Sequence, residues 1–315
     1  MNWMGLATYE LNQTTHTAWV VDKKLYDLTS IRNIGFHDLP IVFLQSINEV
    51  LNHWEDFNFP EMIKKIEDLI SNQKVQALNA GTYNLCAPFH PGRIFAAASN
   101  YYEHAQEMGT KLAERSESSP FIFMKADTCI ANPGSPVIKP HAVQKLDWEV
   151  ELGVVIGKGG RHITMENALD HVAGYVVFND ISARDLTRRS DYPFSHDWFR
   201  GKSFETFGPM GPWLVPRDCL GNPNYFRMIL DVNGQRMQDG NTKDMIFNIQ
   251  EQIAYLSKMT TLKSGDLIAT GTPTGVGMGR NIFLKSGDLM RAAIEGIGYI
   301  ENQVKAEDED VIKKN

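Results

Sequence analysis

The sequence Lys145-Leu-Asp-Trp-Glu-Val-Glu-Leu-Gly-Val-Val-Ile-Gly157 has the alternation of residue types expected of a β-strand. With a period of two, Glu149 and Glu151 lie on one face of this strand, roughly 7 Å apart. Two carboxylates on one face of an apolar strand repel each other unless a proton or a cation lies between them. A hard divalent ion such as Mg²⁺ or Ca²⁺ accepts oxygen ligands of this kind. The alternative is an antiparallel strand whose glutamates face solvent.

A third carboxylate follows a second apolar run of the chain. Residues 173–178 predict a buried strand, and Asp180 comes where that strand would leave the core. This position makes Asp180 a natural third oxygen ligand for an ion held by the two glutamates.

The composition is that of a large globular protein. The chain has 315 residues, 43% hydrophobic and 22% charged, which suffices for one big domain or two unequal domains. The formal net charge is −7 and no basic cluster occurs, so neither nucleic acid nor a membrane is expected as a partner. No apolar run has transmembrane length, no signal peptide is evident, and three isolated cysteines fit a reducing compartment. A cytoplasmic location is therefore expected.

The chain divides into two parts of unequal length. Residues 1–88 predict a small N-terminal α/β domain with two short strands and two helical patterns, one of them over residues 41–51. A run rich in proline and glycine then marks a break. Residues 89–304 predict a β-rich domain, in which Asn233-Gly234 indicates a type I′ hairpin. Residues 305–315 are expected to be a charged tail.

His104 and Glu107 lie three residues apart in a predicted short helix, so they share a face. A glutamate that orients an imidazole enables the pair to take a proton from water, although exposed pairs with this spacing are common on helices. Lys202 stands among four aromatic residues, which predicts a partly desolvated amine with a lowered pKa that would hold a carboxylate or an enolate oxygen. A lysine in a surface loop is the alternative.

Three further positions are candidates for substrate contacts. Lys125 closes an apolar strand, where a lysine either extends to the surface or contacts an anion. Arg184 begins a more polar stretch that holds two more arginines. Residues 266–279 predict a strand and a glycine-rich loop, whose backbone amides and threonine hydroxyls, Thr272 among them, suit a carboxylate.

Five segments resemble motifs of the fumarylacetoacetate hydrolase (FAH) family, and the resemblance covers about residues 90–303. Each motif alone is weak, but all five occur in the family's order. They are Asn100-Tyr-Tyr-Glu-His-Ala-Gln-Glu-Met108, Glu149-Val-Glu-Leu-Gly-Val-Val-Ile-Gly157, Asn179-Asp-Ile-Ser-Ala-Arg-Asp185, Gly201-Lys-Ser-Phe-Glu-Thr-Phe-Gly-Pro209 and Gly265-Asp-Leu-Ile-Ala-Thr-Gly-Thr-Pro-Thr-Gly-Val-Gly277.

The resemblance implies a fold, an assembly and a metal. The fold is α+β and β-rich, a mixed β-roll or sandwich of the FAH type with a small N-terminal α/β domain. The assembly is a homodimer. The metal is Mg²⁺, Mn²⁺ or Ca²⁺, held by Glu149, Glu151 and Asp180.

The resemblance also implies residue roles and a reaction. His104 with Glu107 would activate water or shuttle protons, Lys202 would stand beside the substrate oxygens, and Thr272 would contact the substrate carboxylate. The expected activity is metal-dependent hydrolysis of a C–C bond in a 2,4-dioxo acid, such as an acylpyruvate or a fumarylacetoacetate-like compound, through a metal-bound enolate. One alternative is a decarboxylase, hydratase or isomerase acting on a 2-oxo or 2-hydroxydienoate acid of aromatic catabolism. Another is a non-catalytic protein stabilised by its metal.

Overall fold

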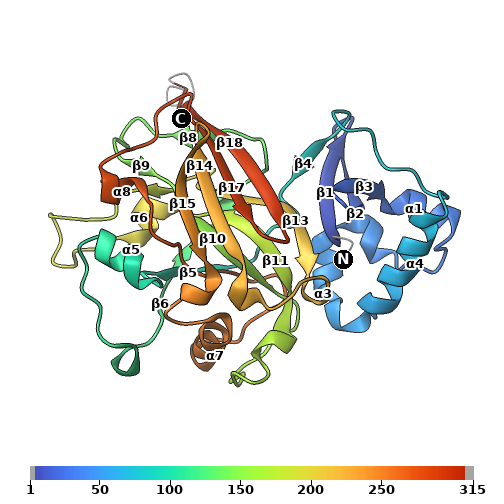
Figure 1. Cartoon of the computed structure of the whole chain (residues 1–315), viewed down its shortest axis with the longest axis horizontal. Coiled ribbons are helices and arrows are strands. Elements are labelled where there is room, and N and C mark those ends of the chain that lie inside the picture. The colour runs from blue at the N-terminus through green and yellow to red at the C-terminus, as the bar shows by residue number, and fades with distance from the viewer. Residues whose placement is uncertain (1–3, 309–315) are drawn as a thin grey trace.

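The computed structural model describes residues 4–308, which form two lobes that share one β-sheet (Figure 1). Two short strands extend this sheet: β4 (Asn84–Cys86) pairs with the first strand of the chain, and β7 (Ile130–Ala131) pairs with a central one. The sheet order is β3 (Lys24–Asp27), β2 (Thr14–Val21), β1 (Met4–Leu11), β13 (Gly208–Pro216), β11 (Val172–Asn179), β10 (Val150–Ile156), β16 (Leu267–Ala269), β5 (Ile94–Ala98) and β6 (Phe121–Lys125).

The N-terminal lobe, blue in Figure 1, combines the strands β1 to β3 with four helices. The longest helix is amphipathic, because its buried apolar residues recur three or four positions apart. Leu6 in β1 pairs with Leu214 in β13, which joins this lobe to the rest of the sheet. The helices are α1 (Leu28–Ile34), α2 (Val42–Gln45), α3 (Ile47–Asn52) and α4 (Phe59–Ser71).

Residues 41–51, expected as one helix, form the two helices α2 and α3. Ser46 separates them with an extended backbone, φ −167° and ψ 161°, and its side chain accepts a hydrogen bond from Glu49 N. A serine oxygen that caps a new helix competes with continuation of the preceding one. The single-helix prediction was therefore wrong at this residue.

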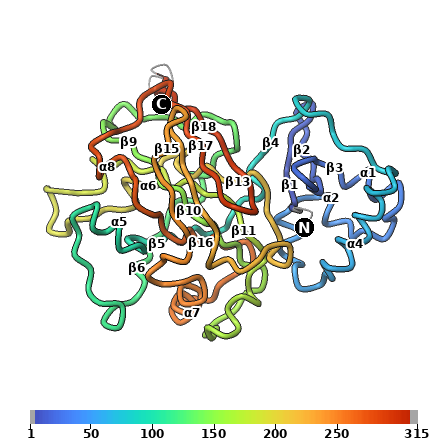
Figure 2. Tube along the Cα trace, in the orientation of Figure 1, coloured from blue at the N-terminus to red at the C-terminus, as the bar shows by residue number. Residues whose placement is uncertain are grey.

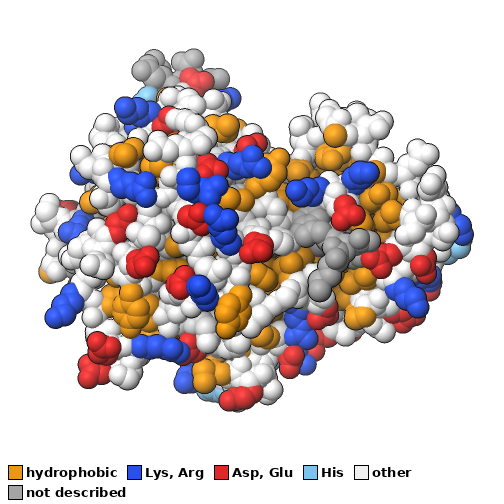
Figure 3. Space-filling view, viewed as in Figure 1, with side chains coloured by type: hydrophobic (Ala, Val, Ile, Leu, Met, Phe, Trp, Pro, Cys, Tyr) orange, Lys and Arg blue, Asp and Glu red, His pale blue; other side chains and the backbone are white. Residues whose placement is uncertain are grey.

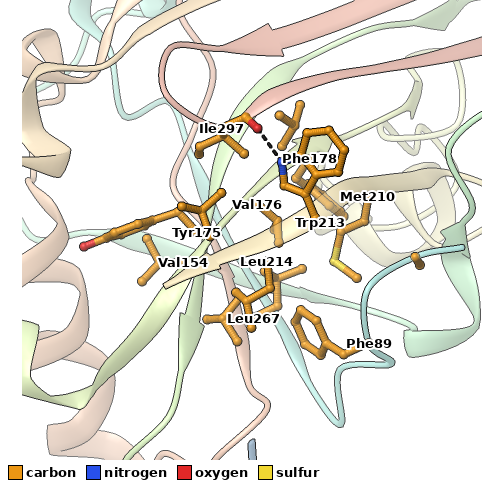
Figure 4. Packing of buried hydrophobic residues seen from close by; sticks show 14 of the residues in the cluster. Phe89, Val154, Tyr175, Val176, Phe178, Met210, Trp213, Leu214, Leu267 and Ile297 are labelled. Carbon is orange, nitrogen blue, oxygen red and sulfur yellow. Dashed lines mark hydrogen bonds between the residues drawn. The ribbon is translucent and has the colours of Figure 1, made fainter. Parts of the chain in front are cut away.

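A second sheet packs across β10, β11 and β13, so these three strands are buried along their whole length. Figure 4 shows the core around them, where the Trp213 Nε1–H donates to the Ile297 carbonyl over 2.6 Å. This bond satisfies the polar atom of a buried indole. The second sheet has the order β15 (Gln235–Asn241), β14 (Arg227–Val232), β17 (Leu289–Ile294), β18 (Gly298–Ala306) and β8 (Val137–Lys139).

Two local predictions in the second sheet have different outcomes. Asn233 and Gly234 have φ values of 51° and 79°, as a type I′ turn requires, so the predicted hairpin β14–β15 is confirmed. The tail expected from residue 305 begins later, because β18 runs to Ala306 and Glu307 N donates to the Lys139 carbonyl. The rest of the predicted tail, residues 309–315, lies outside the described residues.

The predicted strand over residues 145–157 is interrupted. Its first part is β9 (Leu146–Asp147), which pairs with β12 (Ser182–Ala183), and its second part is β10. Glu149 lies in the gap and Glu151 in β10, and the two strands have different pairing partners.

Four helices complete the second lobe: α5 (Tyr102–Glu107), α6 (Trp198–Lys202), α7 (Ile249–Met259) and α8 (Gly277–Arg280). Figure 2 shows the loops after α5 and before α6 on the side away from the N-terminal lobe. Basic and acidic side chains are interspersed on the face in Figure 3, without an extended basic patch there. Within residues 4–308, no helix is long and apolar enough to cross a membrane.

Candidate active site

Three buried carboxylates meet where β10 begins and β11 ends. The antiparallel register pairs Val150 with Asn179, and Asp180 N donates to the Glu149 carbonyl over 2.8 Å. This register brings one oxygen each of Glu149, Glu151 and Asp180 within 4.8 Å of one another. Glu149 is only 4% exposed and Glu151 only 1%, so the alternative in which the glutamates face solvent was wrong.

Buried cations hold two of these carboxylates. Lys202 Nζ lies 2.5 Å from Glu149 Oε2 and 2.5 Å from Asp180 Oδ2. Lys125 donates to the other oxygen of Asp180. Arg184 Nη2 donates to Glu149 Oε1 over 2.5 Å. Glu149 and Asp180 are therefore each fixed by two cationic side chains.

Burial disfavours the charged forms of Glu149 and Lys202, but their ion pairs outweigh it. Arg184 and Lys202 hold the pKa of Glu149 well below its usual range. Asp180 and Glu149 raise the pKa of Lys202 above its ordinary value. The expectation of a lowered Lys202 pKa was therefore wrong, because it considered the aromatic neighbours and not the two carboxylates.

Glu151 differs from the other two carboxylates. It accepts one hydrogen bond, from Gly271 N over 2.9 Å, and pairs with no cation among residues 4–308. Burial, then the nearby charges of Asp180 and Glu149, raises the pKa of Glu151 well above its ordinary value. A proton or a metal ion would relieve this repulsion.

The buried charges around the site do not balance. With all four carboxylates ionised, one negative charge is in excess, and Glu151 is the member that has no cationic partner within residues 4–308. Hard divalent ions prefer several carboxylate oxygens in one place, so the residues present fit such an ion. Four carboxylates, Asp147, Glu149, Glu151 and Asp180, stand against three cations, Lys125, Arg184 and Lys202.

The structure brings His104 and Glu107 together on α5. His104 Nδ1 lies 3.5 Å from Glu107 Oε2, and both oxygens of Glu107 accept from Gly275 N, over 3.1 and 3.0 Å. Burial disfavours the Glu107 carboxylate, but the nearby His104 and the hydrogen bonds from Gly275 N outweigh this and lower its pKa. Glu107 is thus a charged group beside a buried imidazole, whose Nδ1 has no hydrogen-bond partner among residues 4–308.

His104, Glu149 and Glu151 line a cavity of about 570 Å³. Five of its lining residues with ionisable side chains are buried and define its inner end, and apolar residues such as Phe123 and Trp198 also line it. The buried ionisable residues are His104, Glu149, Glu151, Arg184 and Lys202. The volume falls within the usual range of small-molecule sites, roughly 300 to 1,000 Å³. The cavity therefore has room for an organic acid that reaches the carboxylate cluster.

The three predicted substrate-binding residues lie in different places. Lys125 does not line the cavity, since its buried amine binds Asp180 and a main-chain carbonyl. Arg184 lines the cavity but donates to both Asp147 and Glu149. In the structure both cations contact the carboxylates of the cluster.

Thr272 lines the cavity, as a substrate contact must, but its hydroxyl already has two partners. It donates to the Val150 carbonyl over 2.9 Å and accepts from Gln238 Nε2 over 2.8 Å. The single hydroxyl hydrogen is used within the protein. A substrate carboxylate would have to compete with Val150 for it.

Comparison with known proteins places the chain in a family. A family model described as fumarylacetoacetate (FAA) hydrolase, C-terminal, matches residues 93–305. The chain belongs to the fumarylacetoacetate hydrolase family. The matched residues include both glutamates, Asp180, Lys202 and the α5 pair.

Three relatives illustrate the range of this family. The chain is 39% identical over 272 residues to a fumarylacetoacetate hydrolase domain-containing protein 2 homolog of Dictyostelium discoideum, covering 83% of this chain and 87% of that one. It is 44% identical over 216 residues to the 2,4-didehydro-3-deoxy-L-rhamnonate hydrolase of Sphingomonas sp. SKA58, which covers 68% of this chain and 73% of that one. It is 40% identical over 239 residues to the mitochondrial oxaloacetate tautomerase fahd2 of Xenopus laevis, which covers 75% of this chain and 72% of that one.

Solved structures of the fumarylacetoacetate hydrolase family share the whole fold. The fumarylacetoacetate hydrolase of Exiguobacterium antarcticum has a TM-score of 0.79 and 34% identity, covering 96% of this chain and 100% of that one. The maleylpyruvate hydrolase of Sphingobium sp. SYK-6, solved with manganese(II) and pyruvate, has a TM-score of 0.73 and 26% identity, covering 98% of this chain and 100% of that one. The predicted β-rich α+β fold of the FAH type is confirmed.

One buried residue at the site of this fumarylacetoacetate hydrolase family member, Asp147, was not predicted from the sequence. Asp147 accepts hydrogen bonds from Gly277 N and Met278 N, over 2.6 and 3.0 Å, and from Arg184 Nε over 2.8 Å. It thereby links the glycine-rich loop to the arginine that holds Glu149. The strand pattern could have indicated this residue, because Asp147 precedes Glu149 by two positions and so shares its predicted face.

Proposed function

We propose that the protein is a divalent-metal-dependent hydrolase that cleaves the C3–C4 bond of a 2,4-dioxo acid, such as an acylpyruvate. The observation that carries the proposal is the buried group of Glu149, Glu151 and Asp180, two of whose members line a cavity together with His104. The manganese(II) and pyruvate in the related maleylpyruvate hydrolase support a divalent ion and a 2-oxo acid here. Mg²⁺ is the ion we propose, with Mn²⁺ and Ca²⁺ as alternatives.

A divalent ion held by the three carboxylates would supply a Lewis acid for the oxygens of the oxo acid. The Glu107 carboxylate lies 3.5 Å from His104 Nδ1 and would stabilise the imidazolium that forms when His104 takes a proton from water. The resulting hydroxide adds to the C4 carbonyl, and the C3–C4 bond breaks with its electron pair passing to C3. Lys202 offsets the negative charge on the substrate oxygens. A proton returned to C3 completes pyruvate and a carboxylic acid.

The proposal also assigns roles to the two parts of the chain. The residues that line the cavity run from Ala97 to Met278, which supports residues 89–304 as the catalytic domain. Residues 1–88 would then be a separate domain that does not contact the substrate. The proposal includes a cytoplasmic homodimer, and light scattering in solution tests the assembly.

Incubation with an acylpyruvate and Mg²⁺ tests the reaction. The decrease in ultraviolet absorbance measures the loss of the dioxo acid. We expect acylpyruvate loss without CO₂, abolished by chelation and restored by Mg²⁺. Oxaloacetate is assayed in parallel. Pyruvate and CO₂ from oxaloacetate, with the acylpyruvate untouched, would contradict a hydrolase and support a decarboxylase.

A second candidate is an isomerase or tautomerase of a 2-oxo acid. The similarity to an oxaloacetate tautomerase favours it, as does the His104–Glu107 pair, which suffices for proton transfer without an attacking water. Faster decay of enol absorbance from oxaloacetate, without CO₂ and without acylpyruvate cleavage, would support this candidate over hydrolysis.

Replacing His104 should impair the chemical step and leave metal binding unchanged. We expect His104→Asn to lower kcat by about 100- to 10,000-fold, the usual contribution of a general base. Mn²⁺ affinity should not change, because the imidazole is not among the three oxygen ligands. Steady-state kinetics and calorimetry measure the two quantities. The control is Glu103→Gln, on the exposed face of the same helix, which should keep its activity. A fully active His104→Asn would contradict the role of His104 as general base.

A further inference from the structure

The active-site cavity changes character from its inner to its outer end. The carboxylates that line it are Glu149 and Glu151, both buried at the inner end. Apolar side chains also line it, among them Phe123 and Trp198, whose rings stack at a centroid distance of 5.4 Å and an interplanar angle of 21°. Such a wall suits an apolar segment of a ligand and disfavours a charged one.

The outer end is basic. Arg188 and His196 both line the cavity, and both are exposed, unlike the buried cations of the inner end. An isolated antiparallel β-bridge joins their backbones, so the two side chains belong to one local structure at the mouth. Among the described residues, the acidic side chains that line the cavity are Glu149 and Glu151, both at the inner end. An anion that entered the mouth would therefore meet positive charge without a competing carboxylate.

Arg188 and its neighbour Arg189 differ in their partners. Arg189 donates to Asp191 and approaches Asp197, and its guanidinium lies over the Tyr192 ring. The Arg188 guanidinium has no hydrogen bond or ion pair to any residue between 4 and 308, although carboxylates are close in sequence. One of two adjacent arginines is thus neutralised within the protein, and the other faces the cavity.

We infer that Arg188 is a specificity-determining residue that binds a second carboxylate at the distal end of the substrate. The substrate class is then a dicarboxylic 2-oxo acid with an apolar spacer between its two charged ends. The inference rests on the proposed function for the inner end, where the oxo acid binds. A guanidinium suits the outer end, because it binds a carboxylate through two parallel hydrogen bonds.

Non-cleavable ligands test this inference separately from catalysis. The probes are 2-oxo diacids of six to eight carbons, each paired with the 2-oxo monoacid of equal length. Neither series has a 4-oxo group, so binding is measured without turnover, by calorimetry on the protein saturated with Mn²⁺. We expect at least one diacid to bind about 10-fold more tightly than its monoacid, with a preference that declines as salt is added.

Arg188→Gln should remove this preference and leave monoacid affinity unchanged. Arg189→Gln is the matched control, since it removes an adjacent arginine that does not line the cavity, and the preference should remain. Equal affinity for diacid and monoacid in the unchanged protein would overturn the inference while leaving the hydrolase proposal intact. An undiminished preference in Arg188→Gln would also overturn it. If neither series binds, the inference and the oxo-acid site both fail, whereas diacid preference without acylpyruvate cleavage would refute only the hydrolase.

Discussion

The Glu151→Gln variant should fold as well as the unchanged protein and yet lose its divalent ion and its activity. Glu151 pairs with no cation among the described residues, so an uncharged amide there breaks no ion pair and removes repulsion from Glu149 and Asp180. The amide oxygen can still accept from Gly271 N. We expect metal affinity to fall by more than about 100-fold, beyond the usual effect of groups that merely support ligands.

The activity of Glu151→Gln should fall by roughly 1,000-fold, in keeping with the several kcal/mol that a catalytic metal ion supplies. Calorimetry with Mn²⁺, steady-state kinetics and thermal unfolding in chelator measure the three quantities. Full turnover of this variant after exhaustive chelation would refute the metal role. A large loss of stability in chelator would show that the carboxylate has a structural partner instead.

The Glu149→Gln variant should behave differently, although it alters the same cluster. Glu149 is buried and accepts from both Arg184 and Lys202. Removing its charge leaves two buried cations with one anionic partner fewer, and breaking a buried ion pair costs about 3 to 5 kcal/mol. Because each cation retains a second carboxylate, we expect the lower end of this range, together with loss of metal and of activity.

Urea unfolding in chelator measures the stability of Glu149→Gln against Glu151→Gln as the matched control. Both variants exchange one glutamate for glutamine, two residues apart. Equal stabilities would contradict the ion-pair assignments, and an undiminished Mn²⁺ affinity in Glu149→Gln would exclude this residue as a ligand.

Much of the candidate metal site could be predicted from the sequence because its geometry is local. A period of two predicts that Glu149 and Glu151 share a face, and the end of an apolar run predicts that Asp180 lies at the edge of the core. One antiparallel register between β10 and β11 then suffices to bring the three together. The type I′ hairpin was predictable for the same reason, since the turn depends on Asn233 and Gly234 themselves.

The cations of the site could not be predicted in this way, because their partners are distant in sequence. Lys202 pairs with Glu149 across 53 positions, and Lys125 pairs with Asp180 across 55. The local aromatic residues around Lys202 gave the wrong direction for its pKa. The break at Ser46 was missed because a pattern of apolar spacing does not register a capping side chain.

The cavity walls described here come from residues between Ala97 and Met278, while the N-terminal lobe joins through the pairing of Leu6 with Leu214. We therefore expect substrate choice to depend on the second lobe. A chimaera that carries the first lobe of a distant relative should keep its ligand preferences, provided that the strand junction is preserved. Sequence differences between relatives in the first lobe should then affect the assembly or the degradation of the protein in the cell, and not the reaction that it catalyses.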